Sequence, residues 1–283
     1  MSTATDPTAP STTVIRTAAA ARAKRISRRP LLLALEIGVP VLLLALWWFG
    51  SLNSTDPFFP PLRDILVEFQ KLWLFDKFAS DVLPSIGNFL LAYLIACAVG
   101  IALGILLGLV KPLFWILDPI VQFVRSIPAV ALLPIFIATM GFGNEVRIFA
   151  IALASLFPVL ISTIDGVRAT EPLLLETARV YRLTRWERLR SIFIPAASPQ
   201  IFAGALVSLQ VAFIVMITSE MMGAARGIGA LTLLAQGSFD VKGMWAGILL
   251  LGILGYLANL LFTVTRRRAL AWYLGAQKAA SAD

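Results

Sequence analysis

The chain has 283 residues, of which 59% are hydrophobic and 14% are charged, and its formal net charge is +8. Apolar runs of about twenty residues recur, long enough to cross a hydrocarbon core, so the composition excludes an ordinary soluble domain and indicates a helical membrane protein. The sequence has no histidine, which excludes catalysis by histidine and metal sites with histidine ligands. It has a single cysteine, Cys97, so no intramolecular disulfide can form, and it has no P-loop motif for a nucleotide.

The N-terminal part divides into a tail, a span and an amphipathic segment. Residues 1–30 are polar and end in a basic cluster, which predicts a disordered tail that stops at a membrane surface. The apolar run 31–50 is predicted as the first spanning helix, because no small-residue cleavage site follows it as in a signal peptide. Residues 62–75 have apolar side chains at helical spacing, which predicts a helix lying on the membrane or on the bundle.

Five further spans are predicted, at about 84–110, 113–140, 146–164, 200–222 and 244–265. The span 113–140 contains several prolines, among them Pro128 and Pro134, so we expect a bent or broken helix. A glycine-rich loop over 223–229 is interpreted as a flexible or re-entrant gate. The sequence therefore predicts an all-α membrane protein with one transmembrane domain over 31–275 and a C-terminal tail over 276–283.

The distribution of cations predicts the orientation. Most Lys and Arg residues fall in the N-terminal tail, at Lys111, in the charged segment 165–199 and in 266–278, all on one side of a six-span chain. The positive-inside rule places this side, with both termini, in the cytoplasm. The net charge therefore follows from membrane topology, and we expect no nucleic-acid partner.

The charged segment 165–199 is an island between apolar spans. Pro172 is predicted to open a short helix, and Thr184 to cap a second one over 185–192 that Pro195 ends. Two short helices joined at a corner would then face water. A plain solvated loop is the alternative on composition alone.

Within this island, Glu176, Ala178, Trp186, Ile192 and Pro195 resemble the EAA signature of the membrane subunits of bacterial ABC importers. The stretches 125–134 with 141–143, and 219–224 with 227–229, are similar to the permeases for nitrate, bicarbonate, taurine and alkanesulfonates. The island departs from the signature at Thr177, where the family has alanine, and at Arg182, where it has the glycine that opens the turn. Because arginine adopts positive φ at a higher cost, we expect this turn to be helical or shifted by one residue.

The resemblance implies a type I ABC importer permease fold, a homodimer in the bacterial inner membrane, and partners that hydrolyse ATP and deliver solute. The chain itself would bind no cofactor and be no enzyme, since ATP and Mg would be held by cytoplasmic ATPase subunits. A periplasmic or lipid-anchored solute-binding protein would supply a small anion or organic acid. The island would be the coupling helix that docks on the ATPase, through Glu176, Thr177, Ala178, Arg179, Arg182, Thr184, Arg185, Trp186 and Pro195.

Polar residues within the spans are candidates for a substrate pathway or gate. A charge at the bilayer centre costs at least ~2.5 kcal/mol, so it usually has a partner or faces a cavity. Arg125 is the plausible ligand for an anion, and a pair of Arg125 with Glu220 or with Glu145 is expected, with a purely structural pair as the alternative. The candidate residues are Arg125, Ser126, Thr139, Thr218, Ser219 and Glu220.

Gly100, Gly104 and Gly108 recur every four residues in the second span and predict close helix packing, either static or sliding during transport. Two other functional classes compete with a permease subunit. An ion-coupled secondary transporter or channel would need buried acids at mid-membrane, whereas Glu36, Asp118 and Glu220 lie toward the ends of their spans. A membrane-embedded enzyme would need a cluster of acidic or nucleophilic residues that the sequence does not contain.

Overall fold

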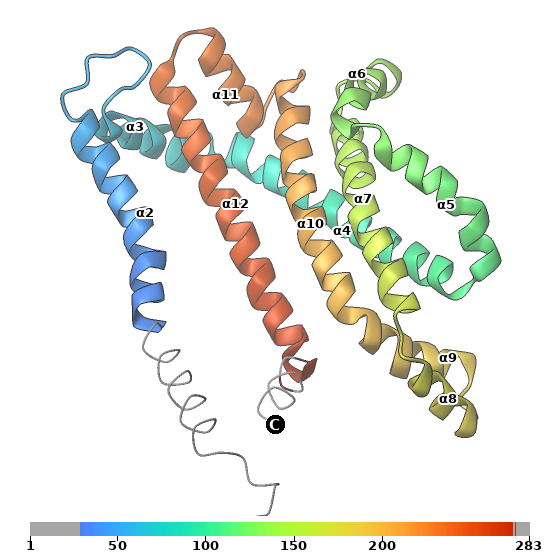
Figure 1. The fold of residues 1–283 in the computed structure, drawn as a ribbon. Coiled ribbons are helices and arrows are strands. Elements are labelled where there is room, and N and C mark those ends of the chain that lie inside the picture. Colours follow the sequence, from blue (N-terminus) through green and yellow to red (C-terminus); the bar gives the residue numbers. More distant parts are fainter. Residues whose placement is uncertain (1–28, 274, 276–283) are drawn as a thin grey trace, which may run out of the picture. The chain divides into compact units, whose positions relative to one another are not determined.

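A computed structural model describes residues 29–273 and 275, so the predicted tails, 1–28 and 276–283, lie outside the described residues. The described part is helical and contains no strand, as predicted (Figure 1). It consists of two units divided after Asp64. In the first, α2 (Arg29–Ser51) has predominantly exposed apolar side chains. A hydrogen-bonded loop follows, in which the N–H of Leu62 donates to the hydroxyl of Ser51 at 3.1 Å, and α3 (Leu62–Phe69) begins there.

In the second unit, the amphipathic segment continues as two wide-turned π-helices, η1 (Gln70–Asp76) and η2 (Phe78–Val82), so the predicted amphipathic helix is confirmed. Four long helices follow the chain: α4 (Leu83–Leu109), α7 (Asn144–Arg168), α10 (Ile194–Met221) and α12 (Val241–Ala269). Between them lie α5 (Lys111–Ser126), α6 (Ala129–Met140), α8 (Pro172–Val180), α9 (Arg185–Arg188), η3 (Leu189–Phe193) and α11 (Ile228–Gly237).

The core of this unit forms where α7 packs between α4 and α10. Glycines permit both contacts. A methyl group at Gly104 of α4 would lie 2.5 Å from Cβ of Thr163, and one at Gly204 of α10 would collide with Ser162, both on α7. The side chains of Tyr93 and Ser208 add hydrogen bonds between helices, to the carbonyls of Ala205 (3.0 Å) and Ser155 (2.6 Å). The predicted glycine face is therefore a packing surface within the chain.

The proline-rich span is broken, as predicted. Helices α5 and α6 meet at an angle of 88°. The break lies at Ile127, whose φ of −77° and ψ of 123° are extended, because the residue before a proline is disfavoured in helical conformation and Pro128 follows. Pro119 and Pro134 lie inside their helices and do not interrupt them.

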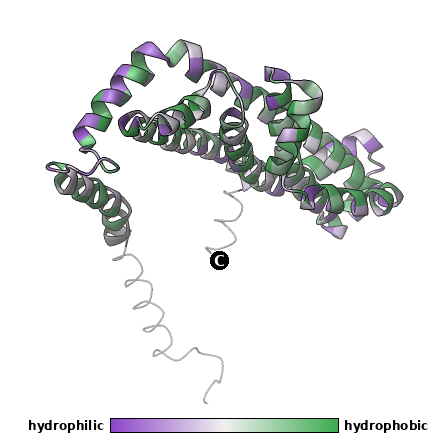
Figure 2. Cartoon of the chain, turned by 90° about the horizontal axis from the view of Figure 1, so that it is seen from above, coloured by the Kyte–Doolittle hydropathy of each residue, from purple (hydrophilic) through white to green (hydrophobic). Residues whose placement is uncertain are grey.

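The structure supports four or five of the six predicted spans. Four helices of the described part are long and apolar enough to cross a membrane, or five if the bent α5–α6 pair is one span. The predicted first span corresponds to α2, of which Gly38–Ser51 is a shorter apolar helix, so the count of six is not confirmed. Figure 2 shows apolar residues predominating along the long helices.

Two boundaries in the second half differ from expectation. Pro195 does not end a helix, because it lies in the first turn of α10, where a proline is tolerated, and Arg185–Met221 is continuous through η3. Pro199 has no N–H for the carbonyl of Pro195, and the hydroxyl of Ser198 donates to that carbonyl at 2.8 Å. The sequence analysis also missed α11, a short helix directly after the glycine-rich loop.

Candidate functional site

The turn between α8 and α9 is formed by Arg182 itself, which has a φ of 51°. The N–H of Leu183 donates to the carbonyl of Ala178 at 3.0 Å, and the N–H of Arg182 to that of Arg179 at 3.0 Å. This is a Schellman arrangement, in which a left-handed residue ends the helix. The expectation of a helical or shifted turn was therefore wrong: arginine occupies the conformation that usually favours glycine, at a cost of about 1–2 kcal/mol.

Thr184 caps the second helix, as predicted. Its hydroxyl accepts a hydrogen bond from the N–H of Glu187 at 3.3 Å, and its own N–H donates to Oε2 of Glu187 at 2.7 Å. The two bonds form a capping box, which satisfies backbone donors at the start of α9. The corner is thus held by backbone and side-chain bonds on both sides of Arg182.

The corner presents an exposed apolar face. Val180, Tyr181 and Trp186 are 80%, 75% and 68% exposed, whereas Ala178 is buried. The predicted residues Glu176, Thr177, Arg179, Arg182, Thr184 and Arg185 are also exposed and surround this face, and Pro195 is half-buried in α10. An apolar patch with a polar rim is typical of a protein–protein contact. Sequence reasoning missed Val180 and Tyr181. They could have been found as apolar side chains within an otherwise charged segment.

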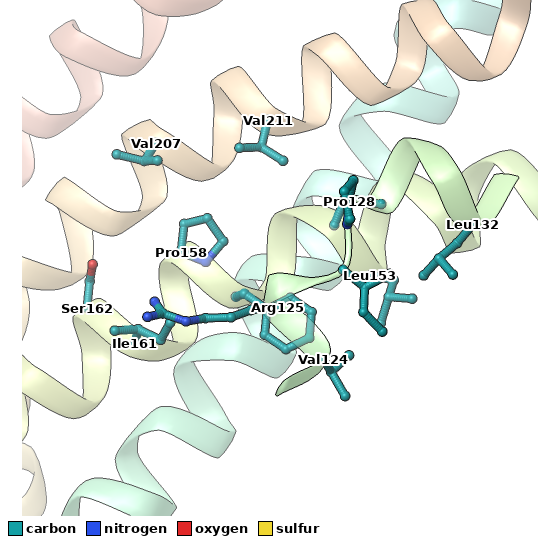
Figure 3. Close-up of a pocket in the computed structure, with 14 residues that line it drawn as sticks. Val124, Arg125, Pro128, Leu132, Leu153, Pro158, Ile161, Ser162, Val207 and Val211 are labelled. Carbon is teal, nitrogen blue, oxygen red and sulfur yellow. The ribbon is translucent and has the colours of Figure 1, made fainter. Parts of the chain in front are cut away.

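A cavity of about 490 Å³ lies at the α5–α6 break, between these helices, α7 and α10 (Figure 3). Its wall is mostly apolar, with Leu132, Phe157 and Val211 among its residues. Among the described residues that line it, Arg125 is the only charged one, and Figure 3 shows its side chain directed toward Ile161 and Ser162 of α7. A single cation in an apolar cavity is suited to fix the charged end of a small anion.

The other hydroxyl candidates do not line this cavity. Ser126, Thr139, Thr218 and Ser219 each donate to a carbonyl of their own helix, at 2.7 to 2.9 Å. Such local bonds satisfy a hydroxyl without any ligand. The structure therefore brings Arg125 alone, out of the predicted pathway residues, to the large cavity. It adds Ser162, which no sequence pattern singled out.

Glu220 is 2% exposed and is not the partner of Arg125. Its Oε1 accepts a hydrogen bond from the hydroxyl of Ser85 at 2.5 Å, and its Oε2 accepts one from the N–H of Gly229 at 2.8 Å. Glu145, the other proposed partner, does not line the cavity that contains Arg125. The structure therefore gives Glu220 partners other than Arg125, and it does not bring Glu145 to the cavity of Arg125.

The glycine-rich loop is anchored to the bundle. Gly227 has a φ of 129°, and its N–H donates to Oδ1 of Asp81 at 2.9 Å. A side chain at Gly227 would lie 2.6 Å from the carboxyl carbon of Glu220, so only glycine fits here. The loop is thus held by two buried carboxylates, and its interpretation as a flexible gate finds no support.

The sequence is similar to those of known transport proteins. The model of the family "binding-protein-dependent transport system inner membrane component" matches residues 100–270. The chain is 29% identical over 238 residues to a putative aliphatic sulfonates transport permease protein, SsuC, of Bacillus subtilis, covering 83% of this chain and 86% of the relative. It is 29% identical over 250 residues to the taurine transport system permease protein TauC of Escherichia coli, covering 84% and 90%.

A nitrate import permease protein, NrtB, of Leptolyngbya laminosa is 32% identical over 149 residues, covering 53% of each chain. Among solved structures, the MetNI methionine ABC transporter in inward-facing conformations has a chain that superposes with a TM-score of 0.58 at 21% identity. That match covers 68% of this chain and 95% of the other, and at this identity it supports the fold alone.

Proposed function

This chain belongs to the family of binding-protein-dependent transport system inner membrane components, the permease subunits of ABC importers, and we propose that it carries a small anion through the cavity that contains Arg125. The relatives named for aliphatic sulfonates, taurine and nitrate all have substrates with an oxyanion group. A guanidinium binds such a group through directed, charge-assisted hydrogen bonds. The position of Arg125 as the lone charge in an apolar cavity carries this proposal.

The cavity is placed for alternating access. It lies where α5 and α6 meet at 88°, and α7 and α10 contribute the rest of its lining. A change of angle at the α5–α6 break would alter the cavity without unfolding either helix, because the backbone of Ile127 and Pro128 is already extended and lies outside both helices. Binding sites in broken helices near mid-membrane are typical of transporters.

The α8–α9 corner is the proposed contact with a separate cytoplasmic ATPase subunit, which would bind ATP and Mg. The face of Val180, Tyr181 and Trp186 supports this, because exposed aromatic and arginine side chains are the usual anchors of protein interfaces. We propose a homodimer with two such ATPases, with both termini in the cytoplasm of a bacterial inner membrane. A solute-binding protein would dock on the opposite side, at the end that contains α11.

The test is uptake by the reconstituted complex of this chain, its ATPase and its binding protein. Proteoliposomes are supplied with internal or external ATP, and uptake of radiolabelled taurine, ethanesulfonate and nitrate is followed. The proposal predicts uptake of at least one of these anions that requires ATP on the α8–α9 side. Uptake by this chain alone, driven only by an ion gradient, would instead identify a secondary transporter.

A further inference from the structure

A second, polar cavity of about 190 Å³ lies at the end of the bundle where α10 meets α11, and it shares no lining residue with the cavity of Arg125. It is bordered by η2, α4, the start of α7, the end of α10 and the loop before α11. In Figure 1 these parts lie at the opposite end of α7 and α10 from α8 and α9. Its polar lining includes Ser80, Asn88, Asn144, Arg147, Glu220 and Arg226.

The two carboxylates near this cavity are already occupied by the protein. Glu220 accepts from Ser85 and from the N–H of Gly229, while Asp81 accepts from the N–H of Gly227 at 2.9 Å and from the hydroxyl of Ser80 at 2.6 Å. Each carboxylate thus has a hydrogen bond on both of its oxygens. These bonds fix the loop that bears Arg226, and they explain why two acids are tolerated in a buried position.

The two arginines at the cavity, Arg147 and Arg226, make fewer hydrogen bonds than the carboxylates. Arg147 lies in the first turn of α7, where it donates a long hydrogen bond, 3.4 Å, to Oδ1 of Asn144 and interacts electrostatically with the carboxylate of Glu220. Arg226 is exposed on the loop. The titratable side chains that line the cavity are Arg147, Arg226 and Glu220, and the carboxylate of Asp81 lies directly behind the lining residues Ser80 and Gly227. Both carboxylates already accept a hydrogen bond on each oxygen, whereas the two guanidinium groups have donors left for a ligand. The N-terminus of α7, at Asn144, adds the positive end of a helix dipole.

We propose that this cavity is a second anion-binding site, which receives a small oxyanion such as a sulfonate before it reaches Arg125. Two guanidinium groups and two side-chain amides, those of Asn88 and Asn144, supply donors for an oxyanion, and the anchored loop carries one of them, Arg226. The volume suits a compact anion. This inference rests on the proposed function, because the proposed membrane orientation puts the cavity at the outer end of the bundle. A solute-binding protein would release its ligand at that end.

The experiment measures the charge preference of the cavity directly. Asn88→Cys is introduced into full-length chain with Cys97→Ser, in the purified complex in detergent. Its rate of modification is compared for two methanethiosulfonate reagents, one with a sulfonate and one with a trimethylammonium group. Ser238→Cys, at an exposed position after α11, normalises the intrinsic reactivity of the reagents.

We expect the sulfonate reagent to be favoured about tenfold over the control ratio, which is the lower end of the range for electrostatic focusing in a charged cleft. Arg147→Gln or Arg226→Gln should abolish this preference, and added ethanesulfonate should slow the reaction more than chloride at equal ionic strength. Arg190→Gln, which changes an exposed arginine on η3, should leave the preference intact.

A normalised ratio near one, or a preference that survives both arginine substitutions, would overturn the proposal. If Asn88→Cys does not fold, Asn144→Cys gives the same comparison from the other side of the cavity. The modification rates do not depend on ATP, so this result stands apart from the proposed function. Loss of ATP-driven uptake with an intact charge preference would refute the importer mechanism and leave the anion site standing.

Discussion

The N–H of Leu183 donates to the carbonyl of Ala178 at 3.0 Å, and this bond closes the corner between α8 and α9 around a left-handed Arg182. Ala178 is buried under the corner while the neighbouring side chains face outward. The corner is therefore a rigid projection, defined by backbone bonds on one side and by the Thr184–Glu187 capping box on the other. A rigid corner can transmit a movement of the proposed ATPase partner to the helices that follow it.

Arg182→Gly should stabilise the chain, because glycine adopts positive φ without the steric cost of about 1–2 kcal/mol that arginine incurs. Thermal unfolding of the purified complex should show a higher midpoint. The matched change Arg190→Gly, within helical η3, should lower the midpoint, since glycine costs about 1 kcal/mol inside a helix. Equal shifts for both variants would contradict the conformation assigned to Arg182.

Trp186→Ala should weaken binding of the ATPase subunit, because a central aromatic anchor contributes about 2 kcal/mol or more, roughly a 30-fold change in affinity. Co-purification and titration with the ATPase measure this. Trp115→Ala removes an equally exposed tryptophan, 72% exposed, from α5 and should leave the affinity unchanged. A loss of affinity in both variants would mean that the corner is not the specific contact.

Gly104→Ala should destabilise the bundle, because its methyl group would overlap Thr163 and force α4 away from α7. Overpacking of this kind costs about 1–3 kcal/mol. Gly252→Ala, on α12 with nothing within 4 Å of the added methyl group, should be neutral or stabilising. Thermal midpoints of the two variants in the same detergent give the comparison, and a neutral Gly104→Ala would argue against close α4–α7 packing.

Local features of the fold could be predicted from the sequence. Pro172 and Thr184 mark helix starts because their effects act within one turn, and Pro128 breaks its span through its immediate neighbour. Features that depend on packing could not. The backbone of Arg182 is set by the two hydrogen bonds that end α8, and Pro195 was misjudged because a proline is compatible with the first turn of a helix.

The candidate site was predicted only in part, for the same reason. Arg125 stood out because a charge in an apolar span needs an explanation. Its assumed partner, Glu220, lies instead against Ser85 and Gly229, which are distant in the sequence and are brought together only by the packing of α4, α10 and α11. Asn88 could be named from the sequence only as one of several polar residues within the spans, and Arg147 carried no recognisable pattern, so the second cavity could not be anticipated.

The central claim, that Arg125 binds the transported anion, is tested most directly by the concentration dependence of ATP-driven uptake in Arg125→Gln and Arg125→Lys proteoliposomes. A charge-assisted hydrogen bond contributes about 1.5–3 kcal/mol, so the glutamine variant should raise KM roughly 10- to 150-fold. The lysine variant should recover part of this loss, because it restores the charge without the planar donor geometry. ATPase binding should be unchanged in both. An Arg125→Gln complex with the wild-type KM would contradict the account.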